Sequence, residues 1–222
     1  MQLEDILDYL YIFPAALIAI ILHELAHGLV SSWLGDPTPR ETGRLTLNPL
    51  KHLDPIGALC LVFFHFGWAK PVVINPSYYK NKKIGMTLVA LAGPIMNFII
   101  TIISFIIIGI TFAIQYNNNL GYNVVFEIIY NFFSYLAILN IGLGVFNLIP
   151  IPPLDGSKAI GVILPKGAYE EYMGYQKYGT FFMMGIMLVI YILSFFNIES
   201  PILKITESIY TFFMEIIYKI VI

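Results

Sequence analysis

The chain has 222 residues, of which 58% are hydrophobic and only 12% are charged. An ordinary soluble domain is about 45–50% apolar and about 25% charged, so this composition excludes that class and predicts a membrane protein in contact with the lipid bilayer. The net charge of −2 comes without a basic tract, which excludes nucleic acid as a partner. The single cysteine, Cys60, excludes a disulfide framework and a multi-cysteine metal cluster, and we interpret it as a free buried thiol.

The first long apolar segment covers about residues 10–34, whereas crossing a bilayer takes roughly 20 residues. The residues before it are acidic and lack the positive region of a secretory signal, so we expect the segment to remain as a membrane span. This span contains the sequence HELAH, which begins at His23. On a helix, His23 and His27 are separated by a full turn plus about 40° and point the same way, while Glu24 lies about 100° round the axis.

The H-E-x-x-H spacing predicts that both imidazoles bind one zinc ion and that Glu24 reaches a water molecule without binding the metal itself. The alternative is that the three polar side chains only hold neighbouring helices together. A carboxylate inside a span is costly, about 2.5 kcal/mol or more for an aspartate on insertion scales, and ionisable residues there usually serve a function. We therefore favour the metal site.

Two short polar stretches after the first span carry strand signals. Residues 43–49 alternate polar and apolar side chains, residues 70–76 are rich in β-branched ones, and both stretches end in Asn-Pro. We expect them to pair as a small β-sheet at the cytoplasmic mouth of the spans; the alternative is a solvated connection. Between them, residues 55–66 are too short to cross the bilayer, which is typical of a re-entrant or partly buried helix. His65 in that helix is expected to be a core histidine rather than a metal ligand.

Three further apolar segments lie at about 84–115, 122–149 and 178–197, so about four transmembrane helices are predicted. Of the 12 basic residues, seven lie in the loop 35–83 and three in the loop 151–177, while the turn at 116–121 has none. By the positive-inside rule both loops are cytoplasmic and the N-terminus is outside. We expect a multi-pass membrane protein with its metal site opening to the cytoplasmic side.

A catalytic zinc ion usually has three protein ligands, so a third ligand is needed beside the two histidines. Asp155 is the only aspartate after residue 54. Prolines at 150, 152 and 153 break the helix before it, and Gly156 after it allows a close approach of the backbone. The alternative is that Asp155 caps the short helix that follows. Zn²⁺ with two neutral imidazoles and the carboxylates of Glu24 and Asp155 has zero net charge, which is tolerable at membrane depth.

The last segment, residues 202–222, is predicted to be an amphipathic helix. Its polar side chains fall on one stripe, and Glu215 with Lys219 forms an i,i+4 pair. The helix is expected either to lie along the membrane interface or to pack its stripe against a neighbour, and we favour a structural role. The stripe consists of Lys204, Glu207, Ser208, Thr211, Glu215 and Lys219.

Several motifs together resemble one known family. The sequences HELAH in a first span, AGPIMN at 92–97 and NLIPIPPLDG at 147–156 are similar to those of the intramembrane zinc metalloproteases of the site-2 protease family. GRLTLNPLKHLDPIGAL and GWAKPVVINP resemble its compact bacterial or archaeal group, which has no PDZ or CBS domain, and this resemblance implies a prokaryotic plasma membrane. The resemblance implies His23, His27 and Asp155 as zinc ligands and Glu24 as the general base. Ser157 departs from the pattern, because many relatives have a second glycine there.

The resemblance also implies a function: hydrolysis of peptide bonds in or near transmembrane segments of membrane proteins. A substrate helix hides its carbonyls in i to i+4 hydrogen bonds and has to unwind locally, and a sheet edge at 43–49 or 70–76 is expected to accept the unwound segment as an added strand. Asn147 is a candidate to hold the substrate backbone or the developing oxyanion, and Asn97 to line the cavity. The alternative for each asparagine is an interhelical hydrogen bond.

The sequence therefore predicts one membrane-embedded protease domain over 1–222, with a catalytic core at about 10–165 and C-terminal helices at 178–222. One rival is a membrane protein that transports or stores zinc, which would call for further ionisable residues along several spans. Another is a catalytically inactive homologue that binds membrane helices. The sequence carries no signal for the physiological substrate, the trigger or the oligomeric state.

Overall fold

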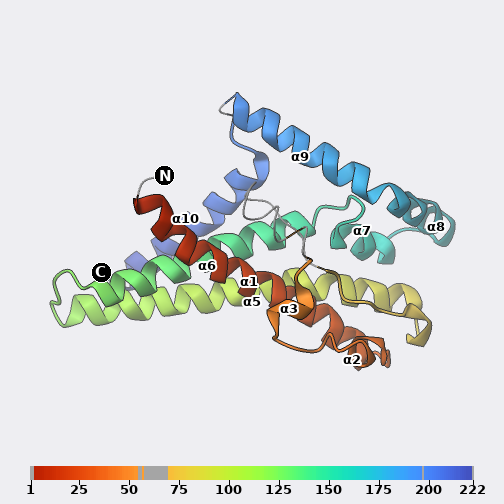
Figure 1. Cartoon of the computed structure of the whole chain (residues 1–222), viewed down its shortest axis with the longest axis horizontal. Helices are drawn as coiled ribbons and strands as arrows, with labels where there is room; N and C mark the ends of the chain where they lie inside the picture. The colour runs from red at the N-terminus through yellow and green to blue at the C-terminus, as the bar shows by residue number, and fades with distance from the viewer. Residues whose placement is uncertain (1–2, 55–56, 58–69, 197, 222) are drawn as a thin grey trace. The chain divides into compact units, whose positions relative to one another are not determined.

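The computed structural model describes residues 3–54, 57, 70–196 and 198–221. Its long helices are α1 (Leu3–Trp33), α5 (Lys82–Asn117), α6 (Val124–Asn147), α9 (Gly179–Phe195) and α10 (Pro201–Val221) (Figure 1). Its short helices are α2 (Thr38–Glu41), α3 (Pro49–His52), α7 (Asp155–Ala159) and α8 (Lys166–Gly174). Single turns of 3₁₀ helix lie at Pro76–Tyr78, Ile160–Val162 and Tyr175–Tyr178. The predicted re-entrant segment 55–66, with Cys60 and His65, lies outside the described residues apart from Gly57.

Among the described residues, three helices are long and apolar enough to cross a membrane. These candidate spans are Asp8–Trp33, Lys82–Asn117 and Val124–Asn147, where the first three spans were predicted. The fourth predicted span corresponds to a helix pair, Gly167–Tyr178 and Phe181–Phe195, that bends by 69° and is either a broken span or a re-entrant loop. A helical multi-pass membrane protein is thus confirmed; the described residues hold three candidate spans, or four if the bent pair is one span, and the predicted number of about four stays a prediction.

The predicted β-sheet at 43–49 and 70–76 is wrong, because no described residue is in a strand. Residues 43–49 turn instead: Gly43 has a φ of +64°, and Asn48 caps helix α3 by accepting a backbone N–H at 3.1 Å. Residues 70–75 form no helix or strand, and three of their backbone N–H groups bond to the carboxylates of Glu24 and Asp36 and to the carbonyl at the end of α3. Those contacts use donors that a sheet ladder would need, so the alternative of an irregular connection holds.

The chain forms two compact units. One consists of Ile20–Met96 and Asn147–Met187, and the other of Met1–Ala19, Asn97–Phe146 and Leu188–Ile222. Helices α1 and α5 each contribute residues to both units. The single protease domain over 1–222 stays a prediction.

In the first of these units, Asp36 ties the end of α1 to the loops that follow it. Its carboxylate accepts hydrogen bonds from Ser31 Oγ at 2.7 Å, from the N–H of Thr38 at 2.9 Å and from the N–H of Asn75 at 2.7 Å. Burial raises the pKa of Asp36, but the hydrogen bonds from Thr38, Asn75 and Ser31 lower it by a larger amount, so the net shift of the pKa is downward. Residues near 75 are thereby held close to the end of α1.

The other unit is built around an apolar cluster on α5, α6 and α10. The buried members of the cluster are Phe105, Ile108, Ala137, Ile141, Met214 and Ile217. Phe105 stacks on Phe213 of α10 with ring centroids 4.8 Å apart. The predicted polar stripe of α10 lies on the opposite, exposed side of that helix, so its amphipathic character is confirmed.

The cluster predicts a clear difference between two isoleucines of α5. Ile108→Ala removes a side chain that is 0% exposed and should lower the free energy of unfolding in detergent by about 2 kcal/mol or more, because the cavity forfeits its packing contacts. Ile106→Ala, at a side chain that is 56% exposed, should cost less than about 0.5 kcal/mol. Chemical unfolding of the two variants beside the wild type checks this, and equal losses would contradict the packing described for α5.

Candidate active site

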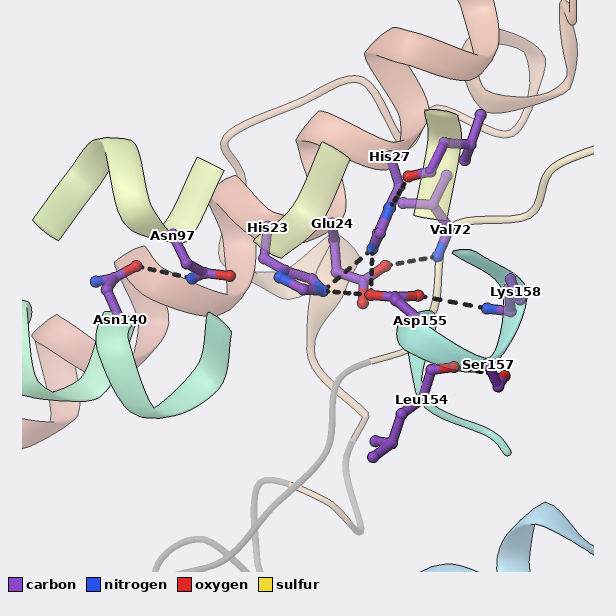
Figure 2. Close-up of polar contacts among 11 residues, drawn as sticks. His23, Glu24, His27, Val72, Asn97, Asn140, Leu154, Asp155, Ser157 and Lys158 are labelled. Carbon is purple, nitrogen blue, oxygen red and sulfur yellow. Dashed lines mark hydrogen bonds and ion pairs between the residues drawn. The ribbon is translucent and has the colours of Figure 1, made fainter. Parts of the chain in front are cut away.

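Three of the predicted site residues converge on one point. The Nε2 atoms of His23 and His27 are 3.1 Å apart, and Asp155 Oδ2 lies 3.1 Å from the first and 3.0 Å from the second. All three residues are buried, with exposed fractions of 5%, 9% and 8%. Figure 2 shows the two imidazoles on α1 facing the carboxylate at the start of α7. The fold thus joins a helical motif to a residue 132 positions further along the chain.

Helix α1 orients the two histidines, and α5 holds one of them in place. His27 Nδ1 lies 2.6 Å from the backbone carbonyl oxygen of Val89. A carbonyl only accepts hydrogen bonds, so this contact assigns the proton to Nδ1 of the neutral ring. The lone pair of His27 Nε2 is then directed at His23 and Asp155, as in metal-binding histidines whose other nitrogen donates to a carbonyl.

The turn before α7 delivers Asp155 to the histidines. Helix α6 ends at Asn147, and the prolines that follow prevent it from continuing. A Cβ at Gly156 would lie 2.3 Å from the carbonyl oxygen of Leu148, so only glycine lets the turn fold back this closely. Leu154, not Asp155, is the N-cap of α7, and the Asp155 carboxylate points to the histidines. Capping therefore does not account for its contacts.

Helix α7 itself holds the outer side of Asp155. Lys158 Nζ lies 3.4 Å from Oδ1, the oxygen that does not face the histidines. Ser157, the departure from the family pattern, is fully buried and donates from Oγ to the carbonyl of Leu154 at 2.6 Å, so it closes the turn. The positive charge of Lys158 favours the ionised form of Asp155, which is the form that binds a metal.

Glu24 lies beside the cluster and is not part of it. Its carboxylate oxygen Oε2 accepts a hydrogen bond of 2.9 Å from the backbone N–H of Val72 (Figure 2). The side chain is half-buried. The motif therefore has the expected division between two convergent imidazoles and a separate carboxylate next to them.

The cluster fits a zinc ion. Two imidazole nitrogens and a carboxylate oxygen face the same point, and the His27 nitrogen presents a lone pair there, so a cation among the three atoms would be stabilised. Ligand atoms of a tetrahedral zinc site, with bonds of about 2.0–2.2 Å, lie about 3.3–3.5 Å apart. The observed separations of 3.0–3.1 Å are slightly shorter. Two histidines and one carboxylate are also a donor set of catalytic zinc sites that keep a fourth position open.

Gly93 of α5 leaves the room that this cluster needs. A Cβ at position 93 would lie 2.5 Å from His23 Cε1 and 2.5 Å from His27 Nε2, closer than any real side-chain atom packs. The glycine of the AGP sequence therefore lets α5 pass directly against both imidazoles. Any larger residue would fill the space at their metal-binding edge.

The two candidate asparagines are placed differently. Asn97 is 0% exposed and donates from Nδ2 to Asn140 Oδ1 at 2.8 Å, which joins α5 to α6 (Figure 2). This contact is the one expected of an interhelical asparagine. Asn147 is half-buried at the end of α6, where the proline turn begins. Their predicted contacts with substrate stay predictions.

The fold and the site define a class of protein: a helical membrane protein with a buried His-His-carboxylate cluster that could hold a metal ion and a glutamate beside it. The model of peptidase family M50 matches residues 11–193, and the chain belongs to that family. The predicted family is thereby confirmed, and the predicted peptidase activity with it. No solved protein structure matches the chain.

Three relatives illustrate the likeness. The chain is 36% identical over 169 residues, 76% of each chain, to "Putative zinc metalloprotease YwhC" of Bacillus subtilis. It is 26% identical over 157 residues to "Putative zinc metalloprotease Rip2" of Mycolicibacterium smegmatis, which is 68% of this chain and 56% of that protein. It is 28% identical over 203 residues to "Zinc metalloprotease MJ0392" of Methanocaldococcus jannaschii, which is 91% of this chain and 47% of that protein. The chain thus spans about half the length of the last two.

Sequence reasoning missed four contributors to the site. Gly93 lies in the AGPIMN motif, directly before Pro94 inside a predicted span, and this pairing was the available signal. Lys158 follows Asp155 by three residues on a helix, a spacing that predicts contact. Val72 acts through its backbone N–H, which every residue except proline has, and Val89 acts through its backbone carbonyl, which every residue has. Neither valine carries a signal in its side chain.

Gly93 leads to a test of the metal centre. Gly93→Ala should reduce bound zinc from one per chain to less than about a tenth, because the methyl group occupies the space between the imidazoles and their metal. Gly109→Ala is the matched control on the same helix, since its Cβ would meet neighbours at an ordinary 3.7 Å or more. Metal content of the purified variants is the measurement, and zinc retained by Gly93→Ala would contradict the geometry.

Proposed function

We propose that this chain is an intramembrane zinc metalloprotease that hydrolyses peptide bonds in or near transmembrane segments of other membrane proteins. The observation that carries the proposal is the convergence of His23, His27 and Asp155, with Glu24 beside them. The histidines and the glutamate lie on α1, which is apolar enough to cross the membrane. Membership of a peptidase family and relatives named as zinc metalloproteases support it.

We assign His23 and His27 as two zinc ligands, through Nε2, and Asp155 as the third, through Oδ2. These are the three atoms that face one another in the structure. Zinc held there would supply a Lewis acid that polarises the scissile carbonyl and lowers the pKa of a water molecule toward about 7. Val89 and Lys158 hold two of the ligands from behind.

Glu24 is the proton carrier in this proposal. It is an anion beside the ligands and not among them, so one of its oxygens is able to take a proton from the attacking water. As the new C–O bond forms and the C–N bond breaks, the same carboxyl group gives that proton to the leaving amine, and the general base is regenerated. Asn147, at the start of the turn that carries Asp155, is our candidate to hold the substrate backbone or the oxyanion, and Asn97 stays a candidate for lining the cavity.

The substrate has to unwind before it reacts, because every interior carbonyl of a helix is bonded to the N–H four residues on. Residues 70–75 and the proline turn at 148–154 are non-helical chain near the ligands, and they offer polar backbone to an unwound segment. We place the site at the cytoplasmic side of a prokaryotic plasma membrane, since the basic residues of the loops 35–83 and 151–177 favour that side.

The first test compares Glu24→Gln with the wild type on a panel of tagged transmembrane segments in detergent. The variant should keep one zinc per chain and lose more than about a hundredfold in kcat, because the amide cannot take a proton. Glu41→Gln, at an exposed glutamate of α2, is the matched control and should cleave like the wild type. A zinc chelator should abolish cleavage, and added zinc should restore it.

The outcome separates the classes of function. If the wild type cleaves no segment while it holds one zinc, the chain is a zinc-binding or zinc-transporting protein or an inactive helix-binding homologue. If Glu24→Gln cleaves as fast as the wild type, Glu24 is not the proton carrier.

The need for unwinding predicts a substrate preference. Segments with Gly, Pro or Asn near the cut should be cleaved at least about tenfold faster than an uninterrupted poly-Leu span, because these residues weaken the helix. The cost within a helix is about 1 kcal/mol for Gly and about 3 kcal/mol for Pro. The measurement is kcat/KM for matched segments that differ at one position. Equal cleavage of the poly-Leu span would contradict a rate limited by helix unwinding.

A further inference from the structure

Residues 70–75, which form no helix or strand, lie against the face of α1 that carries Glu24. We call residues 70–75 the strap. Gly28 lies one turn after Glu24 on the same face of the helix, and a Cβ at Gly28 would meet Val72 Cγ1 at 3.4 Å and Leu45 Cδ2 at 2.8 Å. The missing side chain at position 28 therefore lets the Val72 side chain pack against α1.

The strap is fastened to the surrounding chain at three backbone positions. The N–H of Lys70 donates to the carbonyl of His52 at 2.8 Å, and the N–H of Asn75 donates to Asp36 Oδ2 at 2.7 Å. Between these ends, the N–H of Val72 donates to Glu24 Oε2 at 2.9 Å. The two outer contacts do not involve Glu24, so the Val72 N–H is presented by a backbone that is held independently of it.

We propose that the strap is a positioning element for the general base: the backbone N–H of Val72 holds one oxygen of Glu24 and leaves the other oxygen to exchange protons. The inference rests on the proposed role of Glu24. Within the part of the chain that the structure describes, the Val72 N–H is the one hydrogen-bond donor to the Glu24 carboxylate. Without the strap, a glutamate side chain samples several rotamers, and that freedom is lost again in each turnover.

A backbone N–H suits this task chemically. It donates and does not accept, so it takes no proton from Glu24, and it does not titrate in the range where the enzyme works. It therefore holds Oε2 both when the carboxyl group is ionised and when the other oxygen carries the proton. Its hydrogen bond to the ionised form is charge-assisted, and so it is stronger than a bond between neutral groups. Val72 is a positioning residue, since it acts through Glu24 and not on the substrate.

The experiment removes this one N–H. Val72→Pro should lower kcat by about ten- to a hundredfold, the range for losing a hydrogen bond to a charged group, with KM changed less than about twofold. Bound zinc should stay at one per chain, because the histidines and Asp155 do not touch the strap bond. Val72→Ala keeps the N–H and should recover most of the wild-type kcat.

Two further variants separate the hydrogen bond from other effects of proline. Val73→Pro places the same ring one residue on, at a side chain that is 51% exposed, and should cleave like the wild type. A backbone ester at position 72, made by incorporating the hydroxy-acid analogue of valine, replaces the N–H with oxygen and keeps the side chain. It should show the same fall in kcat as Val72→Pro, and it decides the matter if the proline variant does not fold.

Each outcome decides for or against the strap. A fall in kcat for the ester and for Val72→Pro, with zinc retained, supports it. Wild-type kcat in the ester variant overturns it, and so does a loss of zinc from that variant, because the N–H would then serve the fold. An equal fall in Val72→Ala assigns the effect to side-chain packing instead. If the wild type itself does not cleave, the proposed function fails; if the wild type cleaves, Glu24→Gln does not and the ester variant does, only the strap inference fails.

Discussion

The site depends on one electrostatic constraint: two imidazole nitrogens and a carboxylate oxygen, all buried, meet within 3.1 Å of one another, an arrangement that a cation among them would stabilise. The surrounding parts of the structure serve that meeting. The Val89 carbonyl sets the tautomer of His27, Lys158 holds the outer oxygen of Asp155, and Gly93 leaves the space at the metal-binding edge of both imidazoles. None of these groups is a proposed ligand, yet each keeps the His27 proton, the Asp155 carboxylate or a side chain at position 93 from blocking the point where the metal would bind.

Irregular backbone near the site is the second requirement of a peptidase in the membrane. Unpaired peptide groups are costly in lipid, so non-helical chain is tolerated there only where its polar groups find partners. The strap and the proline turn meet this condition in different ways. The N–H groups of Lys70, Val72 and Asn75 have partners, while the turn contains three prolines, which have no N–H to satisfy. Backbone polarity is thus kept next to the ligands at little cost.

Particular elements show where sequence reasoning succeeded and where it failed. The spans and the amphipathic α10 follow from long apolar runs and a polar stripe, which are local patterns with a strong physical signal. The predicted sheet is wrong although residues 70–76 are rich in β-branched side chains, because strand pairing depends on the available partners. Here the backbone N–H groups of Val72 and Asn75 donate to the side chains of Glu24 and Asp36 instead. The sequence could not tell either whether Asn97 meets a substrate or Asn140, since both alternatives use the same amide.

By itself, the sequence determined that the chain is a helical membrane protein and which side chains have the chemistry of a zinc peptidase. On a helix, the spacing of His23 and His27 points both side chains the same way, and Asp155 is the only aspartate after residue 54 and lies two residues after the last of three prolines. Only the tertiary structure decided how these groups are supported. The Val72 N–H at Glu24, the Val89 carbonyl at His27 and Gly93 against the two imidazoles all come from segments far away in the sequence. Backbone groups are the same in nearly every residue, so their roles appear only when the chain has folded.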